Sequence, residues 1–288
     1  MGFVNSNPDL SGTIFSQPDL EGARQVWQDV FNKIDPDWEA KPVGLLGQQW
    51  VSDDLHSTCC LIDLAQILSV VSRVLTKKSV PVFHTKIRSL LRTRDEKQFN
   101  ELLAELQVAG LLSKYVSPIG FEPIVPEELL RAANKPKSPD YAIRLPSADL
   151  VIEVTVLNTG RDAQQVTSET LLRSFRDALK RKRDQFRHAE PYLLFMTLAN
   201  SAVPLEAVTS LIIDRIWPNP LYSWINGIWL YRIVRDYSKS KPSTRKMFTQ
   251  NPNARLATPE ELLPMFKGQS TFHLHKRSPL PGTVEDGR

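Results

Sequence analysis

The chain has 288 residues, of which 41% are hydrophobic and 24% are charged, and its formal net charge is +4. These values are typical of a globular protein that forms one large domain, or a core with an added module. Its two cysteines are adjacent, which excludes a disulfide framework. The small basic excess is compatible with nucleic-acid contact but does not require it.

The sequence carries no recognisable signal that would direct the chain out of the cytoplasm. Residues 1–18 lack the charged and apolar regions of a secretory signal, and no apolar run approaches the length that spans a bilayer. Cys59 and Cys60 lie in a helical pattern and are expected to be reduced thiols. No C-x-x-C or paired-histidine spacing predicts zinc. We therefore expect a cytoplasmic protein without membrane contact.

The first 94 residues predict a helical N-terminal extension. Apolar residues at helical spacing predict helices over 20–34, with Asp19 as the cap, over 53–77 and over 82–91. The stretch between the first two helices contains Pro and Gly and is expected to be irregular. Basic residues gather toward the end of this extension: Lys77, Lys78, Lys86, Arg88, Arg92 and Arg94. Such a run is either a solvated helix face or a nucleic-acid surface.

A strongly amphipathic helix is predicted over residues 95–113, with Asp95 as its N-terminal cap. Its apolar stripe consists of Phe99, Leu102, Leu103, Leu106 and Ala109. Glu105 lies beside that stripe, three residues after Leu102. Its side chain can therefore face either the protein interior or the solvent.

Two short β-type runs follow, over 141–145 and 150–157, joined by a turn at Pro146-Ser147. Asp140 opens the first run and Glu153 lies in the middle of the second. Because strand side chains alternate, Glu153 shares one face with Thr155, and the other face is apolar: Ile152, Val154 and Val156.

A carboxylate within such an apolar strand costs free energy unless it is paired or binds a metal. A hairpin can bring Asp140 and Glu153 to one edge, where two carboxylates can hold a hard divalent cation through oxygen. The alternative is an edge strand with one solvated Glu.

A helix is predicted over residues 168–188, and it carries a lysine on its apolar side. Its buried stripe consists of Leu171, Phe175, Ala178, Leu179 and Phe186. Lys182 falls on that stripe, and Gln185 follows on the same face. A lysine on the core side needs a partner, and the nearest candidates are the strand carboxylates. The alternative is a lysine that reaches past the stripe to solvent. Four other cations point elsewhere and can contact phosphate: Lys180, Arg181, Arg183 and Arg187.

The remainder of the chain predicts a buried strand over 192–198, a helix over 205–216 and a further strand over 228–234. Residues 238–255 mix basic and polar groups with Pro and Asn. Residues 266–288 are expected to be a flexible tail. His273 and His275 lie in that tail, and two alternating histidines without a third ligand do not predict a metal site.

The Pro139-Asp140 pair and the Glu153-Val154-Thr155 run resemble the PD and (D/E)-x-K elements of the PD-(D/E)XK, or restriction-endonuclease-like, nuclease superfamily. With a further short strand predicted over 121–125, the order helix–strand–strand–strand–helix–strand from 95 to 200 is similar to the core order of that superfamily. The resemblance implies an α/β fold: a mixed sheet flanked by helices over 95–265, after the helical extension of residues 1–94.

One position departs from the motif, because Thr155 stands where the superfamily has lysine. Some divergent branches carry the lysine on the following helix in a K-x-x-Q pattern, which Lys182 and Gln185 resemble. In the same superfamily a Glu of the preceding helix can face the metal. Glu105 resembles that residue, and Glu101 is the alternate.

The resemblance implies a Mg²⁺- or Mn²⁺-dependent nuclease that hydrolyses nucleic-acid phosphodiester bonds, with DNA favoured over RNA. Asp140 and Glu153, with Glu105, are expected to hold the metal. Lys182 is expected to orient the attacking water or stabilise charge on the phosphate. Gln185 would assist by hydrogen bonding, and Thr155 can hold a water. The chain would act as a homodimer or as a subunit of a larger assembly.

Two other functions remain open. In the first, the same fold has lost metal chemistry at Thr155 and serves as a nucleic-acid-binding or assembly subunit. In the second, the tryptophans and N-terminal helices form a surface for a protein partner.

Overall fold

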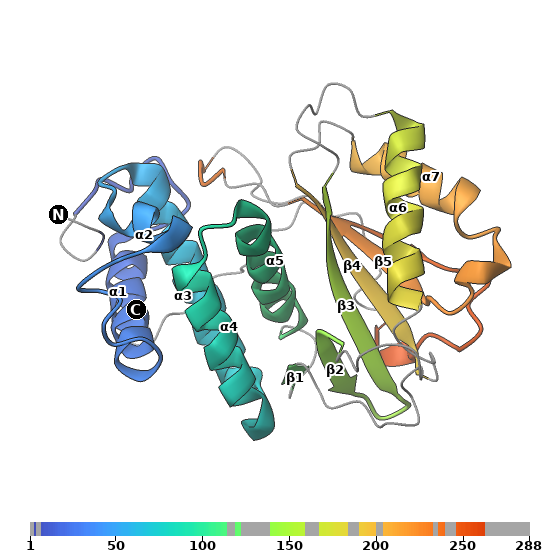
Figure 1. The fold of residues 1–288 in the computed structure, drawn as a ribbon, viewed down its shortest axis with the longest axis horizontal. Helices are drawn as coiled ribbons and strands as arrows, with labels where there is room; N and C mark the ends of the chain where they lie inside the picture. Colours follow the sequence, from blue (N-terminus) through green and yellow to red (C-terminus); the bar gives the residue numbers. More distant parts are fainter. Residues whose placement is uncertain are drawn as a thin grey trace, which may run out of the picture. The chain divides into compact units, whose positions relative to one another are not determined.

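The computed structural model describes residues 3, 7–113, 119–121, 139–158, 167–183, 190–199, 204–232, 236–239 and 246–262. These residues form two compact units (Figure 1). The first contains the described residues up to 113, together with 236–239. The second contains the described residues from 119 to 232, together with 246–262. The boundary between the two units lies after the helix of residues 96–112. The sequence prediction placed the boundary before this helix, at residue 95, and assigned the helix to the nuclease core.

The first unit is built from helices, which the figure labels α1 to α5. Their bounds are Gln17–Lys33, Gly44–Val51, Leu55–Val74, Val80–Arg92 and Glu96–Leu112, with a 3-10 turn at Lys77–Ser79. Asp54 caps α3 by accepting a hydrogen bond from the Ser57 amide, and Asp95 caps α5 in the same way, as predicted. Helix α2 lies in the stretch that was expected to be irregular.

The N-cap of α1 lies three residues before the predicted cap. Ser16 is the N-cap, and the carboxylate of Asp19 accepts a hydrogen bond from the Ser16 amide at 2.8 Å. The two residues therefore form a capping box in which Asp19 is the third helical residue. The prediction of Asp19 as the cap was wrong, because a capping box places an acid at this inner position as well.

Helix α3 is the central helix of the first unit and packs against α1, α2 and α5. Among the described residues it is the one helix long and apolar enough, by length and composition, to cross a membrane. This corrects the expectation that no apolar run approaches that length. A helix in the core of a protein can have the same length and composition, and 72% of the most apolar window of α3 is buried within the structure.

The two cysteines of α3 are buried and free, as predicted. Burial raises the pKa of the Cys59 thiol to about 12. The Cys60 sulfur accepts a hydrogen bond from the Tyr237 hydroxyl at 3.4 Å. Both side chains therefore contribute to the packing of this unit.

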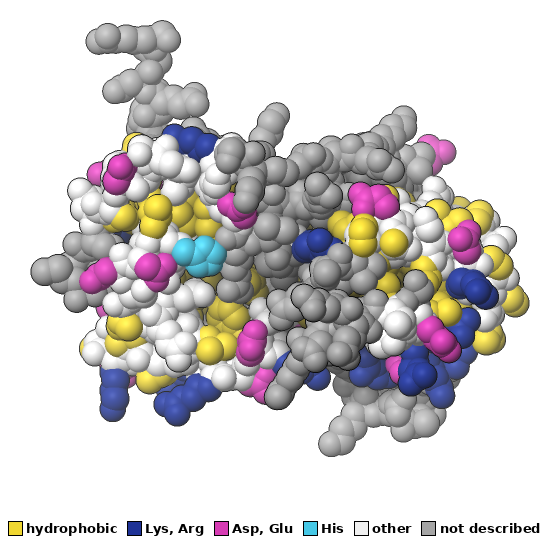
Figure 2. Space-filling model, turned by 90° about the horizontal axis from the view of Figure 1, so that it is seen from above, with side chains coloured by type: hydrophobic (Ala, Val, Ile, Leu, Met, Phe, Trp, Pro, Cys, Tyr) yellow, Lys and Arg dark blue, Asp and Glu magenta, His cyan; other side chains and the backbone are white. Residues whose placement is uncertain are grey.

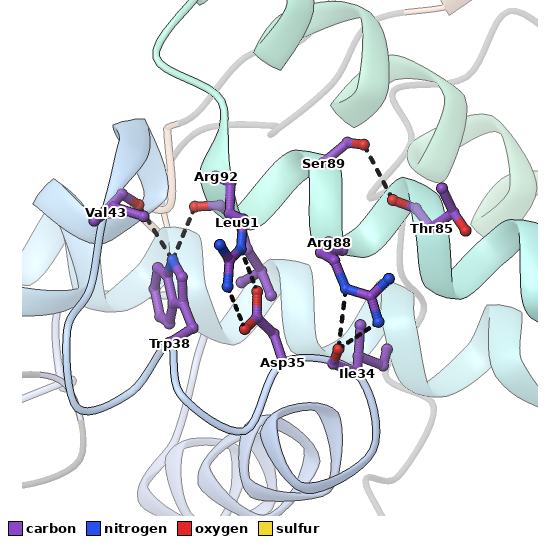
Figure 3. Close-up of polar contacts among 9 residues, drawn as sticks. All are labelled: Ile34, Asp35, Trp38, Val43, Thr85, Arg88, Ser89, Leu91 and Arg92. Carbon is purple, nitrogen blue, oxygen red and sulfur yellow. Dashed lines mark hydrogen bonds and ion pairs between the residues drawn. The ribbon is translucent and has the colours of Figure 1, made fainter.

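The basic residues of α4 form hydrogen bonds with the loop that follows α1 (Figure 3). Arg92 makes two hydrogen bonds to the carboxylate of the buried Asp35, at 2.6 and 2.7 Å. These bonds hold the pKa of Asp35 below its usual value of 3.8. Arg88 donates to the Ile34 carbonyl, and the Trp38 indole donates to the Leu91 carbonyl. This part of the predicted basic run therefore stabilises the unit itself.

The second unit contains a six-stranded mixed sheet whose spatial order, β1-β2-β3-β4-β5-β6, follows the chain. The strands span Ile119–Phe121, Tyr141–Arg144, Asp149–Asn158, Tyr192–Ala199, Gly227–Tyr231 and Lys246–Gln250. The central pairs β3–β4 and β4–β5 are parallel, and the outer pairs are antiparallel. The predicted mixed sheet is confirmed, although β6 lies in a segment that was predicted only as basic and polar.

Helix α6 (Ser168–Arg183) connects the parallel strands β3 and β4, and α7 (Leu205–Arg215) follows β4 (Figure 1). Helix α6 packs on β3, and α7 packs on β5 and β6. Between these helices and the sheet lies a continuous apolar core that includes Phe175, Leu194, Met196 and Ile228. Two 3-10 turns complete the unit, at Pro220–Tyr222 and Glu260–Leu262.

Candidate active site

Strand β3 presents Glu153 and Thr155 to the side of the sheet that α6 and α7 cover. Glu153 pairs in register with Leu194, and Thr155 pairs with Met196. Both partners belong to the apolar core beneath these helices. Side chains at paired positions share a face, so Glu153 and Thr155 also lie on the helix side. The predicted alternation of this strand is therefore confirmed.

Glu153 is fully buried and forms an ion pair with Lys182. The Lys182 ammonium donates a hydrogen bond to Oε2 of Glu153, and the lysine side chain is 12% exposed. On α6 the preceding positions of the same stripe are buried: Leu171, Phe175, Ala178 and Leu179. Lys182 thus points inward, as its place on the stripe predicted. A lysine that reaches past the stripe to solvent does not fit this contact.

Asp140 lies next to Glu153, at the end of β2. Its Oδ2 accepts a hydrogen bond from the backbone N–H of Val154 at 2.7 Å. The antiparallel register pairs Tyr141 with Ile152, so the preceding Asp140 is level with Glu153. Oδ1 of Asp140 makes no hydrogen bond with any residue that the structure describes. The hairpin therefore brings both predicted carboxylates to neighbouring strands.

Thr155 occupies the position where the resembling motif carries lysine. Its Oγ1 is buried and makes no hydrogen bond within the described parts of the chain. A buried hydroxyl of this kind usually has a partner, which can be an ordered water. The environment of Thr155 is therefore suited to hold a small polar molecule beside Glu153.

Tyr192 is a site residue that the sequence reasoning missed. It is almost fully buried at the start of β4, next to Val151 of β3. Burial raises the pKa of its hydroxyl well above its usual value, and the charges of Glu153 and Asp140 raise it further. The hydroxyl group therefore stays protonated near both carboxylates. The only sequence signal was a tyrosine that opens an otherwise apolar strand.

Asn226 fixes the position of Tyr192. Its side-chain oxygen accepts a hydrogen bond from the Tyr192 amide at 2.9 Å, and its side-chain nitrogen donates to the Leu256 carbonyl at 2.8 Å. The backbone amide of Asn226 also donates to the Tyr192 carbonyl. The start of β4 is thus held by both the backbone and the side chain of one buried residue.

Two further residues were predicted for the site, Glu105 and Gln185. Glu105 lies on α5 in the first unit and forms an ion pair with Lys86 at 2.6 Å. Gln185 lies outside the described residues. Within the described ranges, no three His, Cys, Asp or Glu side chains gather in a way that can hold a metal ion. Asp140 and Glu153 are the two carboxylates that the described residues place on neighbouring strands here.

Helix α6 carries cations on its outer surface as well. Four of them are exposed and make no ion pair or hydrogen bond with any residue described in the structure: Arg173, Arg176, Lys180 and Arg181. The acids on this surface are Glu169 and Asp177. Figure 2 shows Lys and Arg side chains gathered at the lower right edge of the molecule, on the side where α6 lies. Within the described parts of the chain these cations have no partner, in contrast to Lys86, Arg88 and Arg92 of α4.

Comparison of the chain with protein-family models, with curated proteins and with solved structures found no match. The function of the site therefore has to be argued from its own geometry.

Proposed function

We propose that this chain is a metal-dependent nuclease in which a lysine of α6 replaces the lysine that the PD-(D/E)XK motif places on the strand. The observation that carries the proposal is the ion pair between Lys182 and the buried Glu153. It joins the strand carboxylate of the motif to the lysine that resembles the migrated motif lysine. Asp140 completes the group from the neighbouring strand.

The burial of this ion pair favours a functional explanation over a purely structural one. Removing a carboxylate and an ammonium from water costs several kcal/mol per ion, and apolar residues of similar volume often stabilise a core equally well. A charged pair at this depth is therefore weak as a device for stability. Strongly perturbed charged groups gather at catalytic sites. Glu153 lies on the same strand and face as Thr155, where the motif would place its cation, and Lys182 reaches Glu153 from α6.

The donor atoms of the site fit a small divalent cation. Oδ1 of Asp140 has no hydrogen bond from the described residues, and Glu153 supplies a second carboxylate on the adjacent strand. Such hard oxygen donors suit Mg²⁺ or Mn²⁺, and Mg²⁺ commonly keeps several waters beside one or two carboxylates. When bound, the cation would lower the pKa of a coordinated water and polarise the phosphate.

The residues of this chain supply positioning and charge. Lys182 holds a positive charge that can orient an attacking water and stabilise the charge that develops on the phosphate. Thr155 offers its buried hydroxyl as a second hydrogen-bond partner for a water. The Tyr192 hydroxyl stays protonated and can donate to an oxygen near the two carboxylates. The Val154 amide binds Oδ2 of Asp140 and so fixes the carboxylate. Oδ1, which has no hydrogen bond from the described residues, is therefore held in one place.

The proposal is tested by nucleic-acid cleavage. Single- and double-stranded DNA and RNA are incubated with the parent protein in Mg²⁺ or Mn²⁺, and with the variants Lys182→Met and Lys180→Met. Loss of Lys182 should lower the cleavage rate by a factor on the order of 10²–10³, because it removes stabilisation made in the transition state. Lys180 is an exposed lysine of the same helix and serves as the matched control. Cleavage by Lys182→Met at the rate of the parent would contradict the proposal.

A second function is favoured by one observation, that the described residues supply only two carboxylates and no third metal ligand. The fold would then serve as a nucleic-acid-binding or assembly subunit without cleavage. Nucleic-acid binding by the parent, with no cleavage of any of the four substrates in either metal, is the result that selects this function.

A further inference from the structure

The two flanks of α6 differ in their surroundings. With 100° between successive residues, Lys182 lies at the centre of the buried stripe, and the remaining positions divide into two flanks. One flank borders a surface groove shared with α7. The groove is lined by Glu169, Leu172 and Arg176 of α6 and by Ala207, Ser210, Leu211, Asp214 and Arg215 of α7.

The charges of this groove balance. Two acids, Glu169 and Asp214, face two cations, Arg176 and Arg215. A polyanion gains little from such a surface, because the attraction of the cations is offset by the repulsion of the acids. The groove between α6 and α7 is therefore a poor path for a nucleic-acid strand.

The opposite flank of α6 lies on the side of Asp140 and Glu153. Helix α6 packs on β3 and α7 on β5 and β6, so the flank that turns away from α7 is directed toward β2. By its helical position Arg181 belongs to this flank, with Thr170 and Ser174 and with Asp177 toward the solvent side. Arg181 is exposed and directly precedes Lys182 in the chain.

Among the residues that the structure describes, none occupies the guanidinium of Arg181. It makes no ion pair or hydrogen bond with any residue in the described ranges, including Asp177 one turn earlier. An arginine can bind a phosphate through two parallel hydrogen bonds, which adds geometric definition to the charge. Its neighbour Lys182 fixes this part of the helix at the carboxylates.

We propose that Arg181 binds a backbone phosphate of the nucleic-acid strand that enters the site, on the β2 side of α6. The inference rests on the proposed function for its occupant, because the site selects a phosphodiester backbone. The nucleic-acid strand would then run along the β2 side of α6. Arg181 would contact it, whereas the three other exposed cations of α6 would not. Arg181 would contribute to binding only. Lys182 and the two carboxylates would act on the reacting phosphate.

The test measures binding separately from cleavage. The affinities of the parent, Arg181→Ala, Arg181→Lys and Arg176→Ala for fluorescently labelled single- and double-stranded DNA and RNA are determined in metal-free buffer over a series of salt concentrations. Arg176→Ala removes one exposed arginine from the same helix on the α7 flank, so it has the same effect on net charge. Circular dichroism confirms that each variant is folded.

Arg181→Ala should weaken binding about three- to tenfold at low salt, as expected for one charge-assisted contact. The slope of log affinity against log salt should fall by about 0.7–0.9, the value of one phosphate contact. Arg181→Lys should retain the slope but recover only part of the affinity, because lysine keeps the charge without the paired hydrogen bonds. Arg176→Ala should leave both quantities unchanged.

Two results would overturn the inference: equal effects of Arg181→Ala and Arg176→Ala, or no binding of the parent to any of the four nucleic acids. Failure of the nuclease proposal gives a different result. In that case the parent binds and Arg181→Ala weakens binding as expected, but Mg²⁺ or Mn²⁺ produces no cleavage.

Discussion

The ammonium group of Lys182 donates a hydrogen bond to the fully buried carboxylate of Glu153, 29 residues earlier in the chain. The two residues belong to one β3–α6–β4 crossover, in which α6 lies over the strand that carries Glu153. The contact is therefore made within a single supersecondary unit. Its consequences for stability and for chemistry can be separated by substitution.

Removing Lys182 alone should destabilise the protein. Lys182→Met leaves a buried carboxylate without its partner, which typically costs about 3–5 kcal/mol. The double variant Lys182→Met/Glu153→Gln removes both charges and should regain most of that loss, while remaining inactive. Chemical denaturation of the parent, both single variants and the double variant measures the coupling energy. Additive single effects would show that the two charges do not interact. A mutation at Lys182 should thus affect folding as well as chemistry.

Asp140 should be needed for cleavage more than for stability. In Asp140→Asn the amide oxygen can still accept the hydrogen bond of the Val154 amide, so the unfolding free energy should fall by no more than about 1 kcal/mol. Cleavage should fall by about 10² or more, because one carboxylate of the metal pair is lost. Asp149→Asn is the control, since Asp149 is a half-exposed acid of the same hairpin paired with Arg144. An equal loss of activity in both variants would assign the effect to the hairpin as a whole.

A lysine at the motif position should restore part of the activity that the loss of Lys182 removes. Thr155 shares the face of Glu153, two residues along β3, so Thr155→Lys in the Lys182→Met background returns an ammonium to that face. We expect at least about a tenfold gain over Lys182→Met alone, a fraction of the 10²–10³ that such a contact supplies. Val156→Lys in the same background is the control, because Val156 faces the other side. A gain from Val156→Lys would indicate that any added cation is sufficient.

The cap of α3 should make part of the stability dependent on pH in acid. Hydrogen bonds from Ser52 and Ser57 lower the pKa of Asp54 from 3.8 to about 2. Because the folded pKa is depressed, the contribution of this carboxylate is complete above pH 3.8 and is lost as the pH falls toward about 2. Asp54→Ala should cost about 1 kcal/mol at neutral pH. Asp54→Asn retains a capping oxygen and should reduce the loss between these pH values.

Urea denaturation at several pH values measures this effect. Asp53→Asn, at the preceding exposed position, is the control and should behave as the parent. The prediction is contradicted if the unfolding free energy of Asp54→Asn falls more steeply in acid than that of the parent.

The strength of the local sequence pattern decided which features could be predicted. Glu153 and Lys182 were assigned correct faces because strand alternation and helical spacing are independent of the rest of the chain. Helix α2 was missed because it is short and contains two glycines, and β6 was missed because its apolar positions are few. Patterns of five to eight residues carry too little periodicity to be separated from loops.

The residues that need tertiary information were not predictable. Tyr192 lies near Glu153 and Asp140 because β4 pairs with β3 in parallel, and no local signal fixes that register. Glu105 was assigned to the metal by analogy, and its ion pair with Lys86 of α4 was not predicted. A glutamate beside an apolar stripe can meet any cation that an adjacent helix presents, and the sequence does not state which helix is adjacent.

The hydrogen bond between the Val154 amide and Asp140 also provides a spectroscopic signal. This amide proton is directed at a carboxylate that we propose as a ligand. Any cation or phosphate that draws electron density from Asp140 should shift the Val154 amide resonance and alter its hydrogen-exchange rate. A single backbone nucleus in β3 would then report occupancy of the site without a substrate, an added label or a catalytic turnover.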